Sequence, residues 1–66
     1  MQIYNFVERE LDVFRKECNF SDEEMTYFNL RAKNKSNTQI ALEMHISEAK
    51  VSKLARRVKD KILKVI

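Results

Sequence analysis

Apolar residues recur along this chain at steps of three and four positions, the spacing that brings side chains onto one face of an α-helix. The pattern predicts four helices, at about residues 2–18, 21–33, 37–44 and 48–64. Gly and Pro are both absent, so the residues that usually shape hairpins and sandwich turns are missing. We therefore expect an all-α fold, and the length suits a single domain over residues 1–66.

The starts of three helices are marked by serines, which can cap the free backbone N–H groups of a first turn. Ser21 is followed three residues later by Glu24, the spacing of a capping box. Ser36 and Gln39 repeat that spacing before the third helix. Ser47 is expected to cap the fourth helix.

The ends of the first two helices are marked by asparagine. Asn19 and Asn34 follow the last residues of the periodic pattern, and asparagine enters the left-handed backbone region more readily than most residues. They are expected to end these helices in the way that glycine usually does.

The apolar stripes of the four helices are expected to face one another and form the core. On the second helix, Tyr27 and Leu30 border the stripe. The stripes comprise Ile3, Phe6, Val7, Leu11, Phe14 and Cys18; Met25, Phe28 and Ala32; Ile40, Ala41 and Met44; and Val51, Leu54, Ala55, Val58, Ile62 and Val65.

The third and fourth helices, with the short turn between them, have the pattern of a helix-turn-helix. Such a motif needs a small residue where the two helices pack closest, apolar residues on the first helix and in the turn, a cap on the second helix, and apolar anchors behind it. The alternative is a generic helical hairpin with the same spacing. The residues that meet these requirements are Ile40, Ala41, Met44, Ile46, Ser47, Val51 and Leu54.

The net charge of +3 is unevenly distributed. Residues 1–30 contain three basic and seven acidic side chains, whereas residues 31–66 contain ten basic and three acidic ones. A basic half is typical of a nucleic-acid-binding surface. Charge alone is equally consistent with a solvated, lysine-rich helix, so the helix-turn-helix pattern has to carry the functional prediction.

The stretch from Phe20 to Ile62 resembles, without gaps, the DNA-binding domain of LuxR-type regulators, and it is similar to region four of sigma factors. One departure is His45, which stands where the family usually has Gly in the turn; a second is that no counterpart of the family's last helix, often its dimerisation surface, is present. The matching segments are Phe20-Ser21-Asp22-Glu23-Glu24, Ser36-Asn37-Thr38-Gln39-Ile40-Ala41 and Ile46-Ser47-Glu48-Ala49-Lys50-Val51-Ser52.

The resemblance implies a transcriptional regulator that places its fourth helix in the major groove of double-stranded DNA. Glu48 is expected either to accept from a cytosine amine or to stabilise the helix start as a first-turn acid. Lys53 could equally contact a phosphate. The expected base-contacting residues are Ala49, Ser52, Lys53 and Arg56. The expected phosphate-contacting residues are Lys35, Ser36, Thr38, Lys50 and Arg57.

We expect no enzyme, cofactor or metal chemistry. Cys18 and His45 are the only residues of their kinds, and their positions on a core stripe and in a turn do not suit a nucleophile pair. One Cys and one His do not make a zinc site without carboxylates at ligand spacing.

A single recognition helix covers few base pairs, so we expect a homodimer, formed through the first helix or through the tail from Ile62 to Ile66. The lone cysteine favours a reducing, cytoplasmic setting, and no apolar run is long enough for a membrane span. The alternative function is a sigma-like or adaptor helix-turn-helix module that mainly binds a protein such as RNA polymerase or a regulator.

Overall fold

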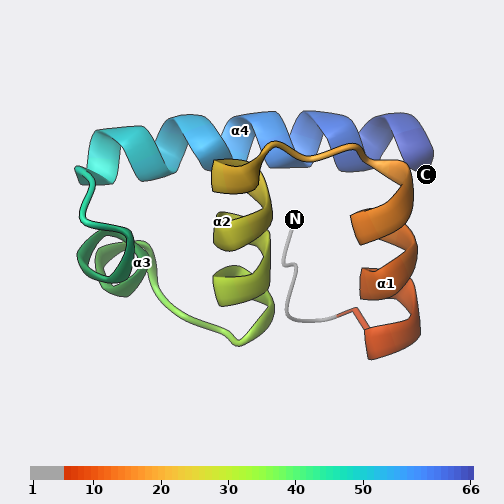
Figure 1. The fold of residues 1–66 in the computed structure, drawn as a ribbon, viewed down its shortest axis with the longest axis horizontal. Coiled ribbons are helices and arrows are strands. Elements are labelled where there is room, and N and C mark those ends of the chain that lie inside the picture. Colours follow the sequence, from red (N-terminus) through yellow and green to blue (C-terminus); the bar gives the residue numbers. More distant parts are fainter. Residues whose placement is uncertain (1–5) are drawn as a thin grey trace.

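The computed structural model describes residues 6–66, which form four helices and no strand. The helices are α1 (Glu8–Glu17), α2 (Asp22–Ala32), α3 (Asn37–Met44) and α4 (Glu48–Val65). The predicted all-α class is confirmed. In Figure 1, α4 runs along one side of the molecule, α1 and α2 stand side by side against it, and α3 lies near the start of α4. None of these four helices combines the length and apolar content that crossing a bilayer requires.

The first helix begins later than predicted. Val7 is extended, with ψ 160°, and Glu8 is the first helical residue. The Val7 N–H donates to Glu10 Oε1 at 3.1 Å, and two acids in the first turn favour a helix start at this point. Val7 consequently leaves the expected apolar stripe and is 63% exposed. Ile3, the other early member of that stripe, lies outside the described residues.

The three serine caps are confirmed. Ser21, Ser36 and Ser47 each accept a hydrogen bond at Oγ from the backbone N–H three residues later, at 3.1–3.3 Å. In turn, the backbone N–H of Ser21 donates to Glu24 Oε1 and that of Ser36 to Gln39 Oε1, both at 2.9 Å. Both predicted capping boxes are therefore closed, and these interactions define where α2 and α3 begin.

Left-handed residues follow the ends of α1, α2 and α3: Asn19 (φ 52°), Asn34 (φ 64°) and His45 (φ 57°). At the end of α3, the Ile46 N–H donates to the Ala41 carbonyl and the His45 N–H to the Leu42 carbonyl. This pair of bonds is a Schellman motif, which normally places glycine at the left-handed position. His45 adopts that conformation in place of glycine, at some steric cost.

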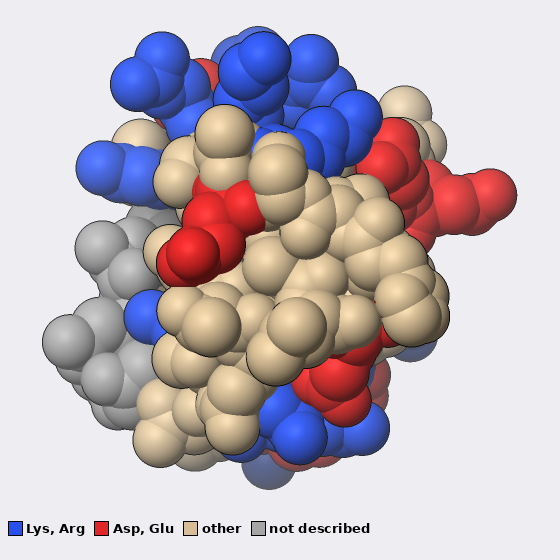
Figure 2. Space-filling view, turned by 90° about the vertical axis from the view of Figure 1, so that its left-hand side faces the viewer, with Lys and Arg blue, Asp and Glu red and all other residues tan. Residues whose placement is uncertain are grey.

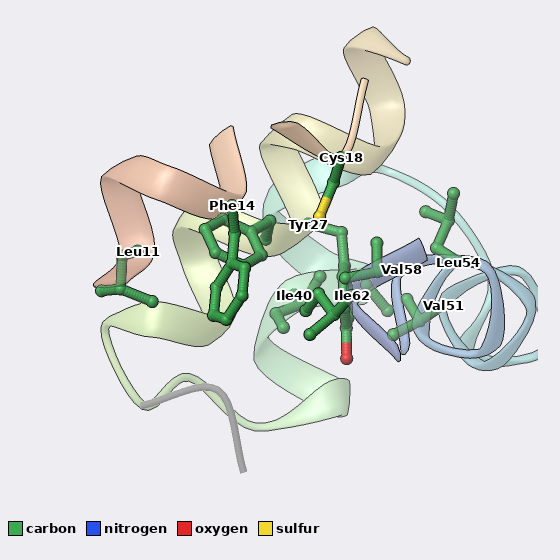
Figure 3. Packing of buried hydrophobic residues seen from close by; sticks show 11 residues of the cluster. Leu11, Phe14, Cys18, Tyr27, Ile40, Val51, Leu54, Val58 and Ile62 are labelled. Atoms are coloured by element: carbon green, nitrogen blue, oxygen red, sulfur yellow. The ribbon is translucent and has the colours of Figure 1, made fainter. Parts of the chain in front are cut away.

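All four helices contribute side chains to a single core (Figure 3). α4 contributes most through Val51, Leu54, Val58 and Ile62, each 0–1% exposed, which recur at steps of three and four. Tyr27 is buried, although it was expected only to border the core, whereas Val65, expected on the buried stripe, is 36% exposed. The other buried members are Leu11, Phe14, Cys18, Phe28, Ile40 and Ala41.

One carboxylate, Glu24, lies in this buried region with 4% of its surface exposed. Lys61 Nζ, from the far half of α4, donates to Glu24 Oε1 at 2.5 Å and to the Asn19 carbonyl at 3.2 Å. Burial would raise the pKa of Glu24, but hydrogen bonds from Lys61 and from Ser21 outweigh it and lower the pKa. The ion pair therefore ties α4 to the α1–α2 junction.

Candidate nucleic-acid interface

The side of α4 opposite the core is exposed along the first half of the helix. The 3.6-residue period places Val51, Leu54 and Val58 inward, so the positions between them face solvent apart from Ala55, which is partly buried. The structure thus brings the four expected base-contacting residues together on one accessible side: Ala49, Ser52, Lys53 and Arg56 are all exposed.

Positive charge concentrates on that side. Ser52, Lys53, Arg56 and Arg57 line an open hollow on the surface of α4. Within residues 6–66 no carboxylate forms an ion pair with Lys53, Arg56 or Arg57. Figure 2 shows Lys and Arg side chains gathered along the edge of the molecule where α4 runs. The cationic groups are therefore available to an anionic partner.

Two of the expected phosphate-contacting lysines have acidic neighbours. Lys50 Nζ lies 3.7 Å from Glu23 Oε2, and Lys35 Nζ lies 3.8 Å from Glu43 Oε1. Both lysines are partly buried, whereas Arg57 is exposed. Ion pairs at these distances on a surface are weak, so a phosphate could replace either carboxylate.

The two expected hydroxyl contacts are also engaged. Ser36 Oγ caps α3, as described above, and its own hydrogen has no partner within residues 6–66. Thr38 Oγ1 donates to Glu48 Oε1 at 3.0 Å, which links the first turns of α3 and α4. Sequence reasoning missed this contact, because it joins side chains ten positions apart whose proximity depends on how α3 and α4 pack.

α3 and α4 are joined by a short turn and pack against each other. Ala41 is buried on α3, and the two residues after His45 complete the turn before α4 begins at Glu48. The left-handed His45 reverses the chain and allows α3 to pack on the start of α4, an arrangement visible at one end of Figure 1.

Cys18 and His45 are not brought together. Cys18 is buried in the core, where burial raises the pKa of its thiol, and His45 is exposed in the turn. Among residues 6–66 no three His, Cys, Asp or Glu side chains are arranged to hold a metal ion.

Comparison of the chain with protein-family models, with curated proteins and with solved structures found no match in any of the three.

Proposed function

We propose that this protein is a sequence-specific double-stranded DNA-binding transcriptional regulator that inserts α4 into the major groove. The observation that carries the proposal is the exposed side of α4, where Lys53, Arg56 and Arg57 lie together without acidic partners in the described chain. An α-helix fits the major groove, which is about 12 Å wide, and cations near its walls neutralise phosphates.

The exposed residues of α4 are proposed to contact either bases or phosphates, according to their side chains and positions. Arg56 offers a planar guanidinium that can donate twice to O6 and N7 of guanine, and Lys53 can donate once to the same atoms or to a phosphate. Ser52 can bond several bases and Ala49 can contact a thymine methyl group. Arg57, on the flank of the helix, is proposed to contact a phosphate. The remaining proposed phosphate contacts are Lys35, Ser36 and Lys50.

A second copy of the chain would extend the site to two half-sites. An apolar groove between α1 and the end of α4 supports a homodimer, because Val13, Val65 and Ile66 are exposed there. The dimer would bind a two-fold symmetric DNA site with half-site centres about one helical turn apart.

A second candidate function is that of a helix-turn-helix module that binds a protein partner such as RNA polymerase. It is favoured by the surface around the end of α3, where Leu42 is 71% exposed and Met44 and Ile46 border a hollow that Asp22 and Glu23 also line. Figure 2 shows uncharged surface on this end of the molecule, with acidic and basic side chains at its margins.

Binding to labelled duplex DNA, measured by fluorescence anisotropy over a range of salt concentrations, tests the proposal. Affinity should fall with salt at a log–log slope of about −0.9 per neutralised phosphate. The triple variant Lys53→Ala/Arg56→Ala/Arg57→Ala should lose nearly all binding. The matched control Arg9→Ala/Lys16→Ala/Lys33→Ala removes the same charge from exposed positions outside α4 and should retain most of it.

An equal loss in both triple variants would show that only net charge matters, and would contradict the assignment to α4. Undetectable binding of the parent protein to mixed-sequence duplex at low salt would favour the protein-binding alternative.

A further inference from the structure

The hydrogen bond between Thr38 and Glu48 fixes a carboxylate at the start of the proposed recognition helix. Thr38 Oγ1 donates to Glu48 Oε1 at 3.0 Å, and both side chains are exposed. No hydrogen bond to Glu48 Oε2 is present within residues 6–66, and no cation is paired with this carboxylate there. One oxygen is thus held in place while the other remains able to accept.

Glu48 lies on the same exposed side of α4 as Ser52 and Arg56. Glu48, Ser52 and Arg56 follow one another at four-residue steps along exposed surface. With a rise of about 1.5 Å per residue, Glu48 lies about 12 Å from Arg56 along the helix axis, so the two side chains would meet different base pairs. The first residues of a recognition helix are those that contact base edges.

A fixed carboxylate in this position can contact only certain groups on DNA. It accepts hydrogen bonds and donates none, so phosphate oxygens repel it. In the major groove, guanine presents two acceptors and thymine an acceptor with a methyl group. Adenine has an amine, but its N7 acceptor lies beside it, whereas the edge of cytosine presents the N4 amine alone.

We propose that Glu48 is a specificity-determining residue that accepts from the N4 amine of a cytosine, and that Thr38 is the positioning residue that orients its carboxylate. This inference rests on the proposed DNA-binding function. It assigns Thr38 a role different from the phosphate contact considered above, because its hydroxyl hydrogen is already donated to Glu48.

Selection of bound sequences from a random duplex pool, followed by affinity measurements on the selected site and its single-base substitutions, tests this inference. The parent protein should select one C·G pair at a position separate from the guanine proposed for Arg56 and should discriminate against other bases there by about tenfold. Glu48→Ala should abolish that preference. Glu48→Gln should shift it toward adenine, because an amide donates and accepts as adenine requires.

Thr38→Val retains the shape of the side chain without the hydroxyl, and should weaken the cytosine preference severalfold at this position alone. The control Glu17→Gln removes one negative charge on α1 and should change total affinity slightly without changing any base preference. Circular dichroism establishes that each variant is folded before binding is compared.

Three results would overturn the inference. If Glu48→Ala selects the same bases as the parent protein, Glu48 does not read a base. If Thr38→Val leaves the cytosine preference intact, Thr38 does not orient Glu48. If the folded parent protein binds no duplex, the proposed function itself fails. This failure differs from a failure of the inference about Glu48, because it is seen with the parent protein before any variant is compared.

Discussion

Cations at different places on α4 lie in opposite surroundings. Near the middle of the helix, Lys53, Arg56 and Arg57 are exposed and form no ion pair within residues 6–66. In the second half, Lys61 reaches a carboxylate, Glu24, that is almost fully buried. The charge of a helix therefore does not identify a binding face by itself. What distinguishes Lys61 from Lys53, Arg56 and Arg57 is the buried acidic partner that the fold places opposite it.

The largest expected effect is on stability and concerns Lys61. Lys61→Met removes the partner of a buried carboxylate, so the free energy of unfolding should fall by about 2 kcal/mol. This loss is smaller than for a fully buried ion pair, because Lys61 is partly exposed and solvent screens the interaction. Denaturant unfolding followed by circular dichroism measures the change. The control Lys59→Met lies at an exposed position and should change stability by no more than about 0.5 kcal/mol. Equal losses in the two variants would contradict the structural role of Lys61.

A substitution on the exposed side of α4 should instead affect DNA binding and not stability. Arg56→Ala should leave the unfolding free energy nearly unchanged but weaken binding to the selected DNA site by about 1–3 kcal/mol if the guanidinium reads a base. Competition between selected and unrelated duplexes measures this. A loss of the same size on every sequence would instead make Arg56 a phosphate contact, and Arg9→Ala serves as the matched charge control.

The buried pair should also make stability depend on pH. Glu24 has a pKa lowered from its ordinary value of 4.5, so its stabilising contribution is complete above that value and is lost as pH falls through the folded-state pKa. Denaturant unfolding between pH 6 and about 3 should therefore show a smaller acid-induced loss for Glu24→Gln than for the parent protein. Lys61→Met should show a smaller loss too, because the cation that holds the pKa low is gone. Identical pH profiles would mean that the pair is not coupled to folding.

The smallest expected effect concerns Lys50, whose Nζ lies 3.7 Å from Glu23 Oε2 in a partly exposed ion pair. Glu23→Gln should free Lys50 and raise affinity for duplex DNA about twofold at low salt, consistent with the small energy of an exposed ion pair. Glu17→Gln removes the same charge from α1 and should have less effect. A rise of the same size in both variants would indicate a general charge effect.

The features that could be predicted from sequence are those set by near neighbours. Ser21 and Ser36 define helix starts through residues three positions away, and Asn34 ends α2 through bonds within a few residues. The exposed side of α4 followed from periodicity, because Val51 and Leu54 had to face the core. The roles assigned to its exposed residues remain predictions.

The features that could not be predicted depend on distant segments. Glu24 looked like a helix-capping acid, and its burial became visible only once Lys61, 37 positions later, was placed against it. The contact of Thr38 with Glu48 likewise depends on the packing of two helices. The late start of α1 coincides with a hydrogen bond from the Val7 N–H to the Glu10 carboxylate, and apolar periodicity carries no information about that bond.

The left-handed residues give this scaffold room for engineering. Asn19 and Asn34 have positive φ angles that glycine adopts without hindrance, and neither lies on the outward side of α4. Substitutions there can relieve steric hindrance at the cost of a more flexible unfolded chain, so each position is a separate place at which thermal tolerance can be adjusted. The exposed positions among residues 48–57 could then be randomised on a stabilised framework that keeps Val51 and Leu54, as in a library of redesigned recognition helices.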